Sequence, residues 1–428
     1  MQPNWSLATG LSLFAALSCG QPAALHTTSN ADPSEIAQTL LANRPVANVA
    51  HATESTGTGA GTLDPEPTAP AQADQPVGTV RVVLGVSPSR RIPVQLWYPA
   101  EESARAAAAA GRSVLEFEPA GPEREQWARL VASATPHFTQ KTMHAADAPP
   151  AAASKQRLPL VLISHCADCL RFGYFPVAER LAAHGFLVAA ADHVDGTLYD
   201  AAKGTSVGLD VDDFLEQRRL DMFALTDAML DPEASSIPQD LRARVDPERI
   251  GMLGHSFGAL TTAYASTRDP RIRAIGILAM VASTDDRLPY TGAELAKRVM
   301  LQPLSKPAFY LAATEDIIQL FGMNDIIRSN FEHSPAAAWL ATLKDAGHYS
   351  VTNLCGINDA YLNGCGPGQR VENLFERFTY LNLDLATDMT AQLVTTYFEQ
   401  QLLGAARTSF AEIVSHHTSV LTVAQHTP

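Results

Sequence analysis

The sequence predicts an α/β fold in which a mostly parallel central sheet carries helices on both faces. After residue 157, short apolar runs alternate with amphipathic segments, which is the pattern of β-α units. The apolar runs lack polar alternation, as expected for strands that are covered on both sides. The pentapeptide Gly254-His255-Ser256-Phe257-Gly258 lies between one such run and a helical segment. This strand-turn-helix arrangement is the third observation that favours the fold.

The composition indicates a globular chain and argues against a nucleic-acid-binding protein and against a membrane-spanning one. The chain has 428 residues, of which 46% are hydrophobic and 18% charged, enough for one large domain plus an extension. Its formal net charge is −14, and Lys and Arg form no run that would follow a phosphate backbone, so we expect no nucleic-acid partner. No apolar stretch is long enough to span a bilayer as a helix. Any membrane attachment is therefore expected only through the N-terminus.

Residues 1–19 resemble an export signal. Leu7–Leu17 is a short apolar stretch, and the following Ser18-Cys19-Gly20 resembles the end of a bacterial lipoprotein signal, with Cys19 as the lipidation candidate. The first ten residues contain no Lys or Arg, whereas a signal usually begins with a basic segment. We expect an exported protein, either anchored or released; an ordinary apolar N-terminus and a mis-assigned start are the alternatives.

Residues 20–77 are rich in Ala, Thr, Pro, Gly and Ser. Such a segment buries too little apolar surface to offset its ordering entropy, so it predicts a flexible linker, with a short helix near Ser34–Leu41. The ordered domain is expected at 78–404. Residues 405–428 are expected to form a C-terminal extension, which the pattern does not place.

The domain begins with a predicted β-hairpin. Its strands, 80–86 and 92–97, are rich in β-branched residues and flank a turn around Pro88. Residues 101–157 form an insertion with two helical segments. The further predicted elements are, in order, strand 160–163, helix 177–184, strand 186–191, helix 212–230, strand 250–253, a helix from 258, strands 275–280 and 308–313, a last strand at 339–343, and a helix around 389–402 that ends at Gly404.

The pentapeptide predicts a nucleophile elbow with Ser256 as the nucleophile. A tight turn between strand and helix strains the serine backbone, and small residues at positions 254 and 258 let neighbouring chain pass close by. The turn lifts the hydroxyl above the sheet, and the helix N-terminus favours negative charge that develops there. A Gly-Ser turn with no chemistry is the alternative reading.

A serine hydroxyl needs a base, and the fold's chain order places the acid and then the histidine after the serine. Five histidines follow Ser256, but only His348 lies just after the predicted last strand. We therefore predict His348 as the base. Asp316 comes directly after strand 308–313 and is predicted as the acid that orients the imidazole. Glu315 is the first rival, and Asp285 and Asp286 are the second.

Two backbone N–H groups are predicted to form the oxyanion hole. One belongs to Phe257, the residue after the nucleophile, and the other to Ala167, in the loop after strand 160–163. Cys166 and Cys169 lie in the same loop. A stiffening disulfide is the favoured reading for this pair, and a redox pair or a metal site with His165 are alternatives. Cys355 and Cys365 bracket a loop after His348 and predict a second disulfide.

Several segments together resemble the type II platelet-activating factor acetylhydrolase family. They are Arg91–Pro99, Leu160–His165, Ala182–Ala189 and Gly254–Gly258. The wider group includes dienelactone-hydrolase-like enzymes and bacterial polyester hydrolases. The resemblance implies the α/β-hydrolase fold and a carboxylic ester hydrolase that acts on small-molecule or lipid esters without a metal or cofactor. The acetylhydrolases carry their acid after strand 275–280, which has no carboxylate here, so the acid is expected at Asp316, as in polyester hydrolases.

The sequence thus predicts acyl transfer through an acyl-enzyme on Ser256. Two other classes of function stay open. A non-catalytic binding or surface protein on the same scaffold would show a distorted triad or a blocked pocket. A peptidase or acyltransferase would keep the nucleophile but change the bond or the acceptor.

Overall fold

The computed structural model describes residues 74–428 except 154–155, 206–210, 280–303 and 318–321. Residues 1–73 lie outside the described residues, and with them Cys19, the signal-like segment, most of the predicted linker and the predicted helix near Ser34. So do Asp285 and Asp286.

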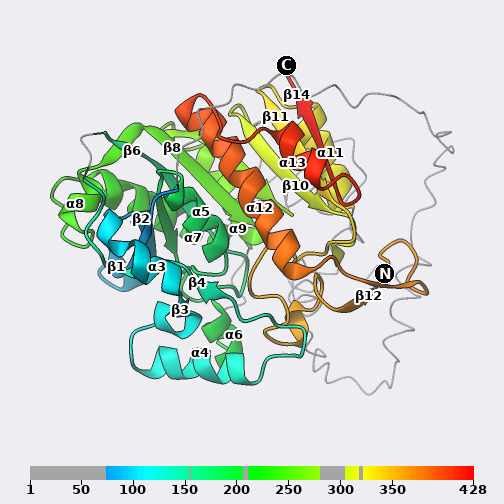
Figure 1. Cartoon of the computed structure of the whole chain (residues 1–428), viewed down its shortest axis with the longest axis horizontal. Coiled ribbons are helices and arrows are strands. Elements are labelled where there is room, and N and C mark those ends of the chain that lie inside the picture. The colour runs from blue at the N-terminus through cyan, green and yellow to red at the C-terminus, as the bar shows by residue number, and fades with distance from the viewer. Residues whose placement is uncertain (1–73, 154–155, 206–210, 280–303, 318–321) are drawn as a thin grey trace, which may run out of the picture. The chain divides into compact units, whose positions relative to one another are not determined.

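A ten-stranded sheet forms the centre of the described chain (Figure 1). Its six central strands, from β11 to β7, run parallel to one another. The strands are, in spatial order, β14 (Leu421–His426), β11 (Ala338–Leu343), β10 (Ala308–Ala313), β9 (Ile272–Leu278), β8 (Val245–His255), β6 (Leu158–Ser164), β7 (Leu187–Ala191), β2 (Arg90–Pro99), β1 (Val77–Ser87) and β5 (Ala146–Asp147). The predicted α/β class with a mostly parallel sheet and an N-terminal antiparallel hairpin, β1-β2, is confirmed.

Helices cover both faces of this sheet. Helix α5 packs against α12 on one side, and α7 packs against α9 on the other. The α-helices are α3 (Arg105–Ala110), α4 (Pro122–Ala132), α5 (Phe175–Ala183), α6 (Leu198–Lys203), α7 (Val211–Leu230), α8 (Gln239–Arg242), α9 (Phe257–Ser266), α11 (Met323–Glu332), α12 (Leu383–Phe398) and α13 (Phe410–His416). Every residue of β6 and β10 is buried, which explains why their sequences lack polar alternation.

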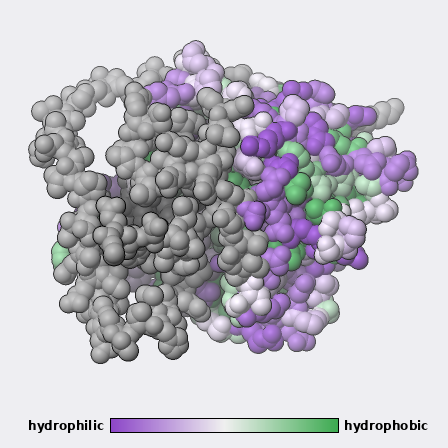
Figure 2. All heavy atoms as spheres, turned by 180° about the vertical axis from the view of Figure 1, so that it is seen from behind, coloured by the Kyte–Doolittle hydropathy of each residue, from purple (hydrophilic) through white to green (hydrophobic). Residues whose placement is uncertain are grey.

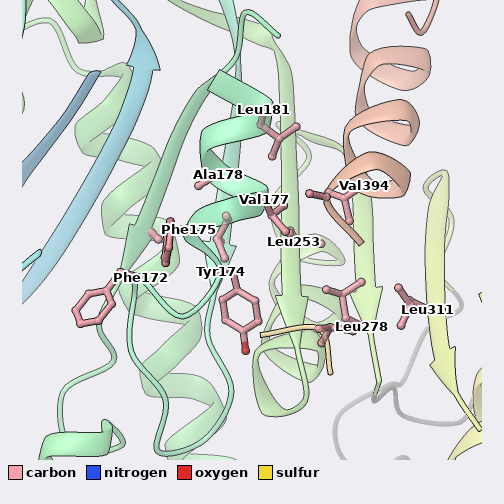
Figure 3. Close-up of a cluster of buried hydrophobic side chains, with 14 of the residues drawn as sticks. Phe172, Tyr174, Phe175, Val177, Ala178, Leu181, Leu253, Leu278, Leu311 and Val394 are labelled. Carbon is pink, nitrogen blue, oxygen red and sulfur yellow. The ribbon is translucent and has the colours of Figure 1, made fainter. Parts of the chain in front are cut away.

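The core between the sheet and the α5-α12 layer is apolar. Figure 3 shows Val177 and Leu181 of α5, Val394 of α12 and the strand residues Leu253 and Leu278, which belong to one buried cluster. Helix α12 continues into a π-helical turn, Glu399–Leu403, and ends at Gly404, whose φ of 84° is left-handed. Glycine adopts this conformation without a side-chain clash, and the predicted helix stop at Gly404 is confirmed.

The prediction that strand 339–343 is the last one is wrong. Residues 410–416 form α13, and β14 pairs antiparallel with β11 along its whole length. The tail was missed because β14 is a short edge strand whose residues, apart from Leu421, are only partly buried or exposed. Such a strand has a weak apolar signal.

The 101–157 insertion contains α3 and α4, as predicted, together with the short strands β3 (Arg112–Ser113), β4 (Thr142–Met143) and β5. A buried ion-pair network ties it to the sheet. The fully buried Arg171 donates to Glu118 of the insertion at 2.7 Å and to Asp192, just after β7, at 2.6 Å. This network holds the insertion beside the loop that follows β6.

On the face turned away from the view of Figure 1, the described residues present mainly hydrophilic side chains, with smaller hydrophobic areas between them (Figure 2). In the part of the chain that the structure describes, no helix has both the length and the apolar composition needed to cross a bilayer.

Candidate active site

Ser256 stands at the sharp turn between β8 and α9. Its φ of 54° and ψ of −124° place a non-glycine residue in a rarely occupied region, a conformation that costs energy. The turn is held because the backbone N–H of Ser256 donates to the Leu278 carbonyl at 2.9 Å and its carbonyl accepts from Ala259 at 2.8 Å. This is the local geometry that the pentapeptide predicts.

The two glycines of the motif are required by close backbone approach. A Cβ at Gly254 would lie 2.0 Å from the Gly258 carbonyl oxygen. A Cβ at Gly258 would lie 2.0 Å from the carbonyl oxygen of Ser164 and 2.6 Å from that of His165. The second contact also shows that the loop after β6 rests directly against the elbow.

The structure brings His348 to Ser256 over a separation of 92 residues. The imidazole Nε2 lies 2.9 Å from Ser256 Oγ. His348 follows β11 in a loop where Asp345 adopts a φ of 57° and where a Cβ at Gly347 would lie 2.8 Å from the backbone of Asn363. The small residue before the histidine is therefore needed for packing as well as for the turn.

Asp316 completes the chain of hydrogen bonds. Its Oδ2 lies 2.9 Å from His348 Nδ1, and both side chains are buried. A carboxylate can only accept, so Nδ1 of His348 carries the proton and Nε2 is free to accept from the Ser256 hydroxyl. This is the tautomer that a general base requires.

The rival acid Glu315 faces another way. Its Oε1 accepts from Arg370 at 2.8 Å and its Oε2 accepts from the backbone N–H of Val371 at 2.9 Å. The geometry thus favours Asp316 over Glu315 as the partner of His348.

Asn363 is a site residue that the sequence analysis missed. Its Oδ1 accepts from the backbone N–H groups of His348, at 2.6 Å, and Ile317, at 3.1 Å. Its Nδ2 donates to the Glu315 carbonyl at 3.0 Å. One amide therefore connects the acid loop to the base loop. The sequence carries no local signal for this role beyond the position of Asn363 between two cysteines.

His255 also lies against the base. Its ring centroid is 4.7 Å from that of His348, and its Nδ1 lies 2.7 Å from the Tyr174 hydroxyl. Burial, and then the nearby His348, hold the pKa of His255 well below its usual value. His255 therefore packs in its neutral form beside the catalytic candidate.

The two predicted oxyanion donors belong to segments that meet at the elbow. Phe257 is the first residue of α9, and Ala167 lies in the loop whose preceding carbonyls contact Gly258. The loop is shaped by Asp168, whose φ is 56° and whose N–H donates to the Gly196 carbonyl at 3.0 Å.

Both predicted disulfides are present, Cys166–Cys169 and Cys355–Cys365, and all four sulfur-bearing residues are buried. The two braced loops contact each other, since the Tyr361 hydroxyl donates to the Asp168 carbonyl. Bonded sulfurs are not free to bind a metal with His165. Among the residues that the structure describes, no group of three or more His, Cys, Asp or Glu side chains is arranged to hold a metal ion.

Comparisons with known proteins agree with this fold. No family model matches the chain. Platelet-activating factor acetylhydrolase from Bos taurus is 26% identical over 150 residues, which cover 28% of this chain and 34% of the relative. The enzyme of the same name from Canis lupus familiaris is 24% identical over 166 residues, covering 31% of this chain and 37% of the relative. The match thus spans about a third of these relatives.

A solved structure, the ferulic acid esterase from Streptomyces cinnamoneus, superposes with a TM-score of 0.56 at 19% identity. The superposition covers 83% of this chain and 98% of that one. At this identity the likeness shows the fold alone, and the predicted α/β-hydrolase fold is confirmed. The chain is similar in sequence, at a distance, to the acetylhydrolases.

Proposed function

We propose that this chain, which has the α/β-hydrolase fold and a distant sequence similarity to platelet-activating factor acetylhydrolases, is a serine carboxylic ester hydrolase. The observation that carries the proposal is the continuous chain Ser256 Oγ–His348 Nε2–Asp316 Oδ2, with both separations at 2.9 Å. Hydrogen-bond reach between nucleophile, base and orienting acid is the geometry that activates a serine.

The reaction proceeds in two steps. Ser256 Oγ attacks the ester carbonyl carbon while its proton passes to His348 Nε2, and Asp316 stabilises the imidazolium. The negative charge on the carbonyl oxygen is stabilised by the N–H groups of Phe257 and Ala167. The C–O bond to the alcohol breaks, and the alcohol leaves with the proton from His348. Water then repeats the sequence on the acyl-enzyme and releases the acid.

The substrate class is a carboxylic ester, in keeping with the names of the similar proteins. Acyl length and alcohol distinguish the candidates, so the informative panel contains p-nitrophenyl esters of increasing acyl length, a hydroxycinnamate ester, an oxidised phospholipid and a polyester film. The ester with the highest kcat/KM identifies the class.

The decisive experiment compares wild type with Ser256→Ala on p-nitrophenyl butyrate and in labelling by a fluorophosphonate probe. We expect Ser256→Ala to lose activity and labelling. The matched control is Ser266→Ala, which removes another buried serine of α9 whose hydroxyl donates only to the Ala263 carbonyl. Full activity in Ser256→Ala would falsify the proposal, and a wild type that is neither active nor labelled would favour a binding protein on this scaffold.

We also propose that the chain works outside the cytoplasm. The two disulfides support this location, because such bonds persist in oxidising compartments. Globomycin treatment, which blocks lipoprotein signal cleavage, and a Cys19→Ala variant would distinguish a lipid-anchored from a released form.

A further inference from the structure

A second series of serine, histidine and aspartate lies behind the loop that follows β6. Ser164 Oγ is 3.0 Å from His193 Nε2, and His193 Nδ1 is 2.9 Å from Asp221 Oδ2. All three side chains are fully buried. No substrate reaches them, so this series is not a second nucleophilic site, and its role must be sought in what surrounds it.

The negative charge of Asp221 is already compensated. Arg90 donates to both oxygens of its carboxylate, Nε at 2.6 Å and Nη2 at 2.7 Å, a bidentate arrangement that makes a strong ion pair. His193 is neutral in this arrangement, because its Nδ1–H donates to Asp221 while its Nε2 accepts from the Ser164 hydroxyl. The Asp221 carboxylate also attracts Arg218, and the positive charge of Arg90 offsets part of that attraction.

Arg218 lies three residues before Asp221 on α7 and is fully buried. Its Nη2 donates to the His165 carbonyl and lies 3.5 Å from Ser164 Oγ. Its Nε and Nη1 have no hydrogen-bond partner, and it forms no ion pair with any carboxylate in the described part of the chain. Burial lowers the pKa of Arg218 to about 9, which leaves it charged at neutral pH.

This guanidinium contacts the two segments that carry the proposed oxyanion donors, at the His165 carbonyl and at the Phe257 ring. It holds the His165 carbonyl, which rests against Gly258 of the elbow and precedes Ala167 by two residues. Its Cζ lies 5.2 Å from the centroid of the Phe257 ring. The centroid of the Phe214 ring lies 5.4 Å from the same Cζ, and this ring packs at a tilted angle against the Phe257 ring.

A buried, incompletely paired cation is costly for folding, since desolvation is repaid only by good partners. We therefore attribute the buried charge of Arg218 to a role in function and not to a contribution to stability. In an α/β-hydrolase that forms an oxyanion, negative charge appears in the transition state but not in the bound ester, so a nearby cation lowers the barrier selectively.

We infer that Arg218 is a positioning residue for the oxyanion hole, which holds the loop after β6 against the elbow and leaves a positive charge behind Phe257 and Ala167. This inference rests on the proposed esterase function. It assigns the Ser164-His193-Asp221 series the task of anchoring that loop, and it assigns Arg90 the task of keeping Asp221 from neutralising Arg218.

The first test compares Arg218→Met, of similar length but neutral, with Arg218→Lys, which keeps the charge. We expect Arg218→Met to lower kcat on p-nitrophenyl butyrate by about tenfold or more with KM within about twofold. Its affinity for a trifluoromethyl ketone, which binds as an oxyanion adduct of the serine, should fall in step with kcat/KM. The unfolding temperature should stay or rise, because a buried charge is removed, and Arg218→Lys should recover most of the rate.

The second test leaves Arg218 in place. Arg90→Met removes the cation that offsets Asp221, so the carboxylate compensates Arg218 more fully and we expect kcat to fall. This variant remains informative if Arg218→Met fails to fold. The matched control is Arg244→Met: Arg244 also donates to a backbone carbonyl, that of Ala152, but precedes β8 at the opposite end from Ser256.

Wild-type kcat in both Arg218→Met and Arg90→Met would overturn the inference, as would an Arg218→Lys variant that folds and is as slow as Arg218→Met. In either case a wild type that still hydrolyses the ester and is labelled by fluorophosphonate would leave the proposed function standing. A wild type that is inert and unlabelled would overturn both.

Discussion

The side-chain oxygen of Asn363 accepts a hydrogen bond from the backbone nitrogen of His348 at 2.6 Å. The same side chain also bonds the acid loop, so the position of the base relative to the acid depends on one amide. Since a misplacement of about 1 Å can cost a hundredfold in rate, we expect Asn363→Ala to lower kcat by about ten- to a hundredfold on p-nitrophenyl butyrate.

The control for this variant is Asn358→Ala. Asn358 lies in the same disulfide-closed loop but accepts only from the backbone of the short helix that it caps. Equal losses in the two variants, with equal drops in unfolding temperature, would show that Asn363 acts on loop stability alone.

The choice between the two neighbouring carboxylates can be tested directly. Asp316→Asn should lower kcat by about 10³–10⁴-fold, because an amide at this position favours the wrong imidazole tautomer. Glu315→Gln should lose less than about tenfold, since Glu315 pairs with the partly exposed Arg370. Steady-state kinetics on one ester suffice, and the reverse order of effects would assign the acid to Glu315.

The elbow glycines predict a steric effect. Gly258→Ala should destabilise the protein by about 1–3 kcal/mol and abolish most activity, because the added methyl group meets backbone oxygens that cannot move independently. Gly85→Ala is the control, since nothing lies within 4 Å of its Cβ position. Denaturant unfolding monitored by fluorescence gives both free energies, and an unaffected Gly258→Ala variant would contradict the geometry of the elbow.

The two disulfides should contribute unequally to stability. Loop-closure entropy gives about 2–3 kcal/mol for Cys355–Cys365, with a sequence separation of 10, and about 1.5 kcal/mol for Cys166–Cys169, with a separation of 3. We expect the Cys355→Ala/Cys365→Ala pair to lower the unfolding temperature more, and the Cys166→Ala/Cys169→Ala pair to lower kcat more. Calorimetry on both double variants tests the expected order of unfolding temperatures, and steady-state kinetics test the expected order of kcat values.

Lys306 predicts a pH-dependent stability. Burial lowers the pKa of Lys306 to about 8, although its Nζ donates to the Asp269 carbonyl at 2.6 Å. Between pH 8 and the usual lysine pKa, the unfolded chain binds more protons than the folded one, so stability attributable to this group rises with pH. The unfolding temperature of wild type minus that of Lys306→Met should therefore increase from pH 7.5 to 10. A flat difference would contradict the lowered pKa.

The elements that local spacing determines could be predicted from the sequence. Each member of the candidate triad follows a strand whose apolar run is visible in the sequence; the three are Ser256, Asp316 and His348. The chain order of the fold and the shared carboxyl end of its parallel strands therefore predicted that these residues would meet. Asn363 and Arg218 could not be predicted, because each acts across a long separation through a backbone carbonyl or amide that has no sequence signature. Helix α7 was predicted, but the role that we propose for its Arg218 depends on the partners of Asp221, which the sequence does not show.

A nascent chain that has been synthesised only up to residue 416 still lacks β14, the strand that pairs with β11. Until β14 is added, the backbone groups on that side of β11 have no strand partner, and an uncovered edge can recruit another chain. A message truncated shortly before codon 421 would thus yield a polypeptide that holds all three residues of the candidate triad yet is prone to aggregate.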